Sequence, residues 1–217
     1  MRELLDEALG ELAWGEKIDA AARQLIVTHA NKVLEVNKTM NLTRITEPAE
    51  MVQRHMIDSL WVVEALSAWG HDAPQNFLDM GSGGGWPFVP MKAVWRKSEG
   101  WAAEKSLKKA KFLKDFCDEV LPRADVWNKQ ARELPQRRYD LITSRAVGSL
   151  AYVFTETHHA IRPDGLLVVF KGPNVDDELD AWQVLCENNE FEQLPPVGFS
   201  LKDGSERYLI AARKTAK

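Results

Sequence analysis

The chain has 217 residues, of which 45% are hydrophobic and 28% are charged. This composition is typical of a globular protein, and the length predicts one domain with at most a small appendage. The net charge of −4 excludes a general attraction to polyanions, so a nucleic-acid partner requires a local basic patch. No apolar stretch is long enough for a membrane span, and residues 1–7 carry acids where a signal peptide has basic residues. We therefore expect a cytoplasmic protein.

Helical spacing of apolar residues marks the first part of the chain. Within residues 1–70, Ile26 and Val33 belong to such a pattern, and Gly15 and Pro48 separate the segments. Nothing directly after these residues resembles a long linker. We expect residues 1–70 to form an N-terminal helical cap that packs on a second unit, residues 71–217.

From residue 75 onward, short apolar runs alternate with helical stretches. The runs lack apolar–polar alternation, which indicates a parallel sheet covered by helices on both faces. An Asp-Gly pair at Asp203 predicts a hairpin between the last two runs, and hence one antiparallel strand. The expected α/β fold has a mostly parallel, seven-stranded sheet with strands at 76–80, 100–104, 125–128, 139–144, 165–171, 194–201 and 207–212.

The first predicted strand ends in a glycine loop, residues 81–85, with the sequence Gly-Ser-Gly-Gly-Gly. Glycines at a strand end let a ligand approach the backbone closely, and Pro87 fits the first turn of the helix that follows. The N-terminus of such a helix suits a carboxylate or a phosphate. The glycine loop alone predicts a nucleotide-like cofactor.

Three residues around the glycine loop narrow the cofactor. A dinucleotide site needs a third glycine where this chain has Trp86. Asp79 suits a cationic amino group better than a pyrophosphate, and Glu104 ends the second predicted strand, where a carboxylate can accept both ribose hydroxyls. Together they favour S-adenosylmethionine, a cofactor with an amino acid and an adenosine. The alternatives are that Glu104 caps the next helix and that Trp86 packs in the core.

Five segments of the chain jointly resemble one family. They are Asn41-Leu42-Thr43, Arg54-His55-x-x-Asp58-Ser59-Leu60, Asp79-x-Gly81-Ser82-Gly83-x-Gly85-x-Pro87, Ser144-Arg145-Ala146 and Lys171-Gly172. From about residue 30 to its C-terminus, the chain resembles the bacterial 16S ribosomal RNA (guanine-N7)-methyltransferase G family, also called glucose-inhibited division protein B. The segment that starts at Arg54, joined to the glycine loop, is far more specific than the loop alone. The resemblance implies a Rossmann-like methyltransferase fold.

The resemblance also implies a reaction, in which S-adenosylmethionine methylates N7 of one guanine of 16S rRNA, free or in the small ribosomal subunit. Residues implied to contact the cofactor are Gly81, Trp86, Glu133, Leu134 and Arg145, beside Asp79, Gly83 and Glu104 from the loop argument. Residues implied to lie near the substrate are Arg145, Lys171 and Arg207. The chain departs from the family pattern at Gly84, Trp86 and Phe88, which affects the cofactor contacts and not the class. We expect a monomer.

The chemistry of guanine N7 decides which catalytic groups to expect. N7 carries a lone pair and no proton, so its methylation needs no general base, and we assign no catalytic acid or base. The enzyme then contributes proximity and orientation. We interpret Arg145, Lys171 and Arg207 as RNA-positioning groups that contact O6 or phosphate, because a donor on N7 would block the reaction. Arg207 also suits a second role, as a charge that protects an edge strand from aggregation.

His55 and Asp58 form a pair of a type that often performs acid–base chemistry. Because N7 needs no base, we favour a buried polar lock between the helical cap and the sheet, and Asn41 has the same two interpretations. The lysines of segment 105–114 are interpreted first as a solvated helix face and second as an RNA patch.

No metal site is expected. His158 and His159 lack the spacing of metal ligands with any acidic partner. Cys117 and Cys186 form neither a metal pattern nor a disulfide framework, so we expect buried free thiols.

Other functions stay open at this point. A nicotinamide dehydrogenase would explain the strand, the loop and the acid, but Trp86 and the lack of a recognisable proton donor disfavour it. A non-catalytic ribosome-binding module is disfavoured by the intact Asp79, glycine loop and Glu104. A methyltransferase of another RNA or of a small molecule is the remaining alternative.

Overall fold

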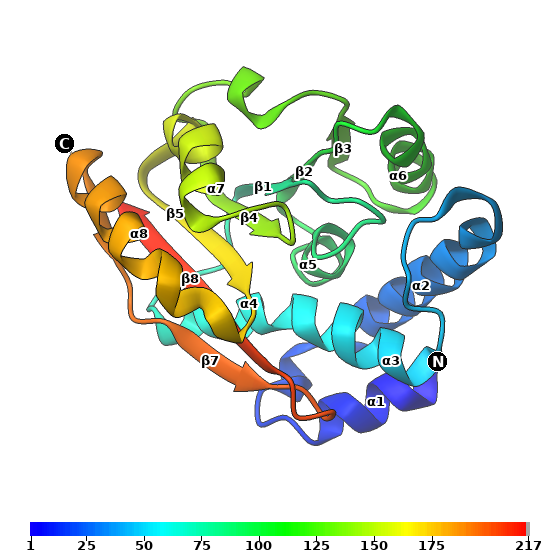
Figure 1. Ribbon diagram of the computed structural model, residues 1–217. Helices are drawn as coiled ribbons and strands as arrows, with labels where there is room; N and C mark the ends of the chain where they lie inside the picture. The colour runs from blue at the N-terminus through cyan, green and yellow to red at the C-terminus, as the bar shows by residue number, and fades with distance from the viewer. Residues whose placement is uncertain (216–217) are drawn as a thin grey trace.

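The computed structural model describes residues 1–215 and shows one sheet with helices on both faces (Figure 1). The strands are β1 (Asn76–Met80), β2 (Glu99–Ala103), β3 (Ala124–Trp127), β4 (Tyr139–Arg145), β5 (Ile161–Lys171), β6 (Phe191–Gln193), β7 (Val197–Ser200) and β8 (Glu206–Lys214). The α-helices are α1 (Arg2–Gly10), α2 (Ala20–Met40), α3 (Pro48–Met51), α4 (Asp58–Ala68), α5 (Phe88–Val94), α6 (Leu107–Val120), α7 (Leu150–Thr157) and α8 (Asp176–Asn188). A π-helix, η2 (Val52–Ile57), joins α3 to α4, and shorter 3-10 turns are η1 (Gly15–Lys17), η3 (Ala131–Glu133), η4 (His158–Ala160) and η5 (Pro173–Val175).

The order of the strands across the sheet is β3-β2-β1-β4-β5-β8-β6, and β7 also pairs with β8. The first five strands in this order are parallel, and β8 is antiparallel to β5, β6 and β7. The predicted mostly parallel sheet with one strand in the opposite direction is therefore confirmed. The strand order changes direction between β1 and β4: from β1 the chain continues to β2 and β3 on one side, and from β4 it continues to β5 on the other. Ligands of such folds bind beyond the carboxyl ends of the strands at this point.

The sheet differs from the prediction at its edge. The sheet has eight strands and not seven, because an unpredicted short strand, β6, precedes the run expected at 194–201. That run forms only β7, which begins at Val197 because Pro195 and Pro196 precede it. Proline has no N–H group to donate to a ladder, so it interrupts a strand. The predicted hairpin between β7 and β8 is present, and Asp203 accepts a hydrogen bond from the Ser205 N–H at 2.9 Å in its turn.

Alternate residues of each strand face two different cores. Phe77 of β1 packs in a cluster with Ile26 and Val33 of α2, whereas its neighbour Leu78 packs with Trp182 of α8. In Figure 1 the helices α1–α4 lie on one side of the sheet, and α7 and α8 lie on the other. The expected helices of residues 1–70 thus cover one face of the sheet, and a boundary at residue 70 stays our proposal.

Two further features follow from the described residues. No helix within residues 1–215 is long and apolar enough to cross a membrane. Cys117 and Cys186 are buried free thiols, as the sequence predicted.

Candidate functional site

The glycine loop lies between the end of β4 and helix α2. Gly81 has a φ of +75°, and a Cβ atom there would lie 2.3 Å from Val147 Cγ2. Gly85 has a φ of +100°, and its Cβ would lie 2.6 Å from His29 Nε2. Both positions need a left-handed backbone and a close approach, which only glycine allows without strain. The glycines therefore let the chain turn tightly beside two other segments.

Glu104 ties the glycine loop to helix α6. Its Oε2 accepts a hydrogen bond from the Gly83 N–H at 2.9 Å, and its Oε1 accepts one from the Ser106 N–H at 2.7 Å. The residue is only 7% exposed. The contact with Ser106 is the helix-capping role named as the alternative, and the contact with Gly83 adds a role in shaping the loop.

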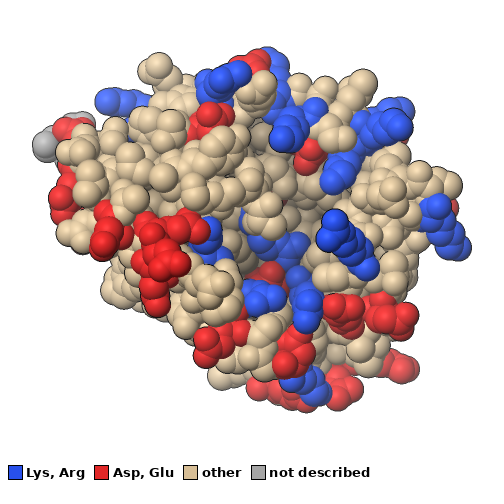
Figure 2. Space-filling view, in the orientation of Figure 1, with Lys and Arg blue, Asp and Glu red and all other residues tan. Residues whose placement is uncertain are grey.

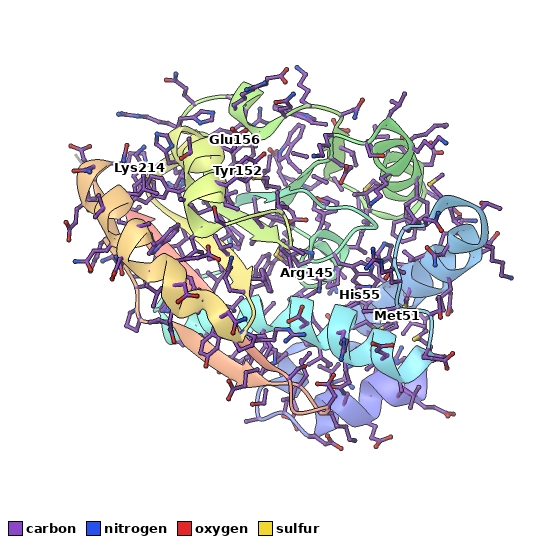
Figure 3. All side chains as sticks on the ribbon, viewed as in Figure 1. Met51, His55, Arg145, Tyr152, Glu156 and Lys214 are labelled. Carbon is purple, nitrogen blue, oxygen red and sulfur yellow. The ribbon has the colours of Figure 1, made fainter. Side chains whose placement is uncertain are left out.

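A cleft of about 380 Å³ opens beyond the ends of β1, β2 and β4, and we call it the loop cleft. Small-molecule sites usually measure about 300–1,000 Å³, so the volume suits a ligand of that size. The cleft is lined by Met80, Gly81, Ala103, Glu104, Lys105, Lys109, Lys129, Gln130, Ala131, Ala146, Val147, Tyr152 and Glu156. Tyr152 and Glu156 of α7 are labelled in Figure 3. Of the residues expected to contact a cofactor, Gly81 and Glu104 line the cleft, and Asp79, Gly83, Trp86, Glu133, Leu134 and Arg145 do not.

The turn η3 explains why the expected residues Glu133 and Leu134 do not line the loop cleft. Gln130 and Glu133 form a capping box, in which each side chain bonds to the backbone of the other residue. The Glu133 carboxylate is thus used within the turn, and Leu134 is buried in the core. Gln130 and Ala131 line the cleft instead, each three residues before the corresponding expected position. The spacing Gln-x-x-Glu was the signal in the sequence.

Trp86 lies beneath the glycine loop and is 5% exposed. Its ring is 4.5 Å from the ring of His29 and 5.1 Å from the ring of His55, measured between centroids. The His29 Nε2–H donates to the Gly84 carbonyl oxygen at 2.7 Å, and burial lowers the pKa of this imidazole to about 3, so it is neutral. Trp86 therefore has the packing role named as its alternative, and His29 is a support of the loop that the sequence did not reveal.

Asp79 has no exposed surface and lies at the end of β1, directly below the glycine loop. Its Oδ1 accepts a hydrogen bond from the Thr143 hydroxyl at 2.8 Å, and its Oδ2 has no partner among the described residues. Burial raises the pKa of this carboxyl to about 7. A buried acceptor without a partner is rare in proteins, so Oδ2 is an incomplete site for a donor or a cation.

A second pocket, of about 510 Å³, adjoins the loop cleft, and we call it the basic pocket. It is lined by Ile45, Arg54, His55, Asp58, Arg145, Ala146, Gly148, Phe170, Lys171, Gly172, Arg207 and Tyr208. The structure thus brings together the three predicted substrate residues from β4, β5 and β8. Ala146 lines both pockets and has a φ of +58°, which is unusual for a residue with a side chain and typical of functional sites.

Arg145 is fixed by groups of the η2–α4 segment, as the labelled pair Arg145 and His55 shows in Figure 3. Its NH1 donates to Asp58 Oδ2 at 2.7 Å and to the Arg54 carbonyl oxygen at 3.0 Å. Its NH2 donates to His55 Nδ1 at 3.1 Å. His55 and Asp58 therefore both bind Arg145 and not each other, which forms a buried polar lock between the helices and the sheet. A π-helix such as η2 often marks a functional site.

His55 is held as a neutral imidazole. Burial, followed by the nearby Arg145 guanidinium, lowers its pKa to about 3. Because Nδ1 accepts from Arg145, the ring proton is on Nε2 and is donated to the Thr43 hydroxyl oxygen at 2.8 Å. His55 therefore serves as a fixed acceptor for Arg145 and has no free proton-accepting nitrogen for a substrate.

Acidic side chains balance the other two basic groups of the pocket. Lys171 forms an ion pair with Glu178, whose second oxygen accepts the Leu150 N–H. The Arg207 Nε lies 3.8 Å from Asp58 Oδ1. Lys171 and Arg207 are thus oriented and partly neutralised, and the sequence analysis did not identify Glu178 as a partner.

Apart from the exposed Lys108, the lysines of segment 105–114 divide into two groups. Lys111 and Lys114 form ion pairs with aspartates one turn further along α6, which is the solvated face that was expected first. Lys105 and Lys109 instead line the loop cleft. Figure 2 shows basic side chains gathered around a hollow in this face of the molecule, with acidic side chains over α8.

The histidine pair of η4 binds backbone carbonyls. His158 Nδ1 contacts the Phe154 oxygen at 3.0 Å, and His159 Nε2 contacts the Leu134 oxygen at 3.2 Å. Within residues 1–215, no group of three or more His, Cys, Asp or Glu side chains is arranged to hold a metal ion.

Comparison with known proteins gives a consistent family. A family model described as GidB, rRNA small subunit methyltransferase G, matches residues 22–207. The Ribosomal RNA small subunit methyltransferase G of Stutzerimonas stutzeri is 33% identical over 179 residues, which are 82% of this chain and 80% of that protein. The protein of the same name from Symbiobacterium thermophilum is 30% identical and aligns with 98% of this chain and 89% of its own length. A SAM-dependent O-methyltransferase from Thermotoga maritima has a similar fold, with a TM-score of 0.56, 15% identity and coverage of 85% of this chain and 72% of that one.

Proposed function

The chain belongs to the rRNA small subunit methyltransferase G family, an S-adenosylmethionine-dependent family, and from this premise we propose that it methylates N7 of one guanine in 16S ribosomal RNA. The observation that carries the proposal is the pair of adjoining pockets, one beside the glycine loop and one lined by basic side chains, which meet at Ala146. The family match favours this function over the dehydrogenase and the non-catalytic module.

We further propose that the protein is a monomer, because both pockets are built from one chain. A molar mass of 24.6 kDa measured by light scattering would support this proposal.

Residues that line the loop cleft, together with Asp79 below the glycine loop, fit S-adenosylmethionine. This cofactor supplies a methyl group on a cationic sulfur. The unpartnered Asp79 Oδ2 offers a negative charge below the glycine loop for the methionine amino group. The close approach of Val147 to Gly81 shapes one wall of the cleft, and Glu104 directly follows β2, where ribose hydroxyls bind in related folds. Gln130 and Ala131 would then border the adenine.

The basic pocket fits a guanine and its phosphate. Arginine and lysine are the side chains that most often recognise the O6 and N7 edge of guanine. Arg145 already donates to three acceptors, so its guanidinium is held in place and is not free to turn onto N7. Lys171 and Arg207 can donate to O6 or to phosphate, which leaves the N7 lone pair available.

No residue of the basic pocket needs to act as a base. His55 is the nearest conventional candidate, and its Nδ1 is occupied by Arg145. Placement of N7 in line with the methyl donor is then the main contribution of the protein. The rate should therefore not depend on a protein group that ionises near neutral pH for proton abstraction.

A substrate without N7 tests the proposal. A 16S rRNA fragment would be transcribed with guanosine or with 7-deazaguanosine, in which a carbon replaces N7, and incubated with labelled S-adenosylmethionine. We expect label in the guanosine transcript and none in the 7-deazaguanosine transcript. Equal labelling of both would show that the methyl group goes to another atom.

A further inference from the structure

A group of three lysines borders the loop cleft on the side away from the basic pocket. Lys105 and Lys109 come from the segment that begins α6, and Lys129 comes from the loop after β3. We call these three residues the lysine rim. Lys105 and Lys129 are exposed, and Lys109 is half-buried.

The lysine rim carries positive charge that the folded chain does not neutralise. None of its three ammonium groups forms an ion pair with any residue between 1 and 215, although the Lys129 Nζ lies 5.7 Å from the centroid of the Trp127 ring, a contact that leaves its charge in place. On the same helix, Lys111 pairs with Asp115 and is therefore already balanced. Two acids line the cleft: Glu104 has both oxygens engaged by backbone N–H groups, and Glu156 forms no ion pair with the three lysines. The rim is therefore available to an external anion.

The proposed cofactor does not explain three lysines that have no acidic partner. S-adenosylmethionine has one carboxylate, one ammonium and one sulfonium, so it carries a net positive charge at neutral pH and has no phosphate. Three lysines without an acidic partner beside a cation are unfavourable, because like charges repel. A polyanion that passes over the mouth of the cleft accounts for the lysines better.

The distance between the lysine rim and the basic pocket sets the size of that polyanion. Lys129 follows β3, whereas Arg207 belongs to β8. Neighbouring strands lie about 4.8 Å apart, so the sequence of strands β3-β2-β1-β4-β5-β8 separates the two ends by roughly 24 Å. A stacked nucleic-acid strand has one phosphate per about 3.4 Å, so about seven phosphates cover this distance.

We propose that the lysine rim binds backbone phosphates of the RNA strand to one side of the target guanine, so that the strand crosses both pockets. The inference rests on the proposed function and extends it from one nucleotide to a strand. The rim contributes to affinity without sequence preference, because phosphate contacts position an RNA and carry no base information.

The test compares the RNA affinity of variants that each lose a lysine, inside or outside the lysine rim. Binding of a 16S rRNA fragment to the full chain would be measured across a range of salt concentrations, with S-adenosylhomocysteine present, for K105A, K109A, K129A and the triple variant. K111A is the matched control, because it removes the same charge from α6 outside the rim. Each lost phosphate contact should lower the slope of log affinity against log salt by about 1. We expect this decrease for each rim variant and the wild-type slope for K111A.

Substrate length gives a second readout. A trinucleotide with a central guanosine is too short to reach from the basic pocket to the rim, so the wild type and the triple variant should bind it equally. A triple variant with the wild-type salt slope would overturn the proposal, as would an equal decrease for K111A. Weaker S-adenosylmethionine binding with an unchanged RNA slope would assign the lysines to the cofactor instead. Because RNA binding is measured without methyl transfer, a failure of N7 methylation leaves this result interpretable.

Discussion

Arg145 and Asp58 form an ion pair at the base of the basic pocket, with side chains 14% and 6% exposed. Removing one partner of a mostly buried pair leaves the other charge without compensation, which typically costs about 3–5 kcal/mol. We expect Asp58→Asn to lower the free energy of unfolding by about 3 kcal/mol in urea titrations. The substitution keeps the shape of the side chain, so the loss reports the charge.

Asp203 provides the control for this prediction. It pairs with Arg54 at 2.8 Å, but the two side chains are 41% and 37% exposed. Exposed ion pairs contribute about 0–1 kcal/mol, so Asp203→Asn should have a much smaller effect. Equal losses of unfolding free energy for Asp58→Asn and Asp203→Asn would mean that the buried Arg145 charge does not depend on Asp58 for compensation.

Asp79 links the stability of the protein to pH. Burial raises the pKa of its carboxyl from 3.8 in the unfolded chain to about 7. The stabilising contribution of the protonated form is complete below pH 3.8 and is lost as the pH rises to 7. One pKa unit corresponds to about 1.4 kcal/mol, so Asp79→Asn should raise the free energy of unfolding above pH 7 by at most about 4 kcal/mol. Near pH 4 the two proteins should be equally stable.

Urea unfolding of both proteins from pH 4 to pH 8 measures this difference. A difference that stays constant with pH would show that Asp79 is ionised in the folded protein at all these values. The same variant should bind S-adenosylmethionine more weakly by calorimetry, since an amide cannot balance a cationic amino group. A gain in stability together with a loss of binding is expected of a residue kept for function.

Two glycines with similar backbone angles, one inside and one outside the glycine loop, allow the role of the loop to be tested. Gly81 and Gly70 have similar φ angles, +75° and +72°, but a Cβ at Gly81 would meet Val147, whereas a Cβ at Gly70 would meet nothing within 4 Å. An alanine in this left-handed region costs about 1–2 kcal/mol. We expect Gly70→Ala to lose this amount and to bind S-adenosylmethionine normally.

Gly81→Ala should lose more stability than Gly70→Ala, because the clash with Val147 is added to the backbone cost. It should also bind S-adenosylmethionine more weakly, since Val147 and Gly81 both line the loop cleft. Denaturant unfolding and calorimetry on both variants separate the two costs. Similar behaviour of the two variants would show that the close approach at Gly81 has no role.

Local patterns in the sequence were sufficient to predict several elements. The strand before the glycine loop and the hairpin at Asp203 were predicted correctly, and each depends on neighbours in the chain. The family resemblance, and not a local pattern, implied that Arg145, Lys171 and Arg207 lie near the substrate, and the structure brings them together in one pocket. The late start of β7 also had a local signal, Pro195, although the run of apolar residues around it favoured one longer strand.

Contacts between distant segments could not be predicted in this way. His29 reaches the glycine loop from α2, and Glu178 reaches Lys171 from α8. No spacing rule connects these pairs, because their proximity results from the packing of helices on opposite faces of the sheet. The same applies to Trp86, whose place beneath the loop depends on His29 and His55.

At the scale of the whole molecule, one core joins the N-terminal helices to the sheet. Ile26 of α2, Leu60 of α4 and Phe77 of β1 belong to the same buried cluster. We expect a single cooperative unfolding transition, because loss of either part would expose this shared surface. Far-ultraviolet circular dichroism and tryptophan fluorescence should then give the same urea midpoint. Two separate midpoints would show that residues 1–70 and 71–217 unfold independently.

The most direct measurement is a map of the methyl group on the natural substrate. 16S rRNA and small subunits from a strain without this gene would be incubated with the protein and labelled S-adenosylmethionine, and the RNA digested and analysed by mass spectrometry. We predict that a single guanine gains one methyl group at N7. Label on any other atom, or absence of label from guanine N7 in both the free RNA and the subunit, would contradict the proposed function.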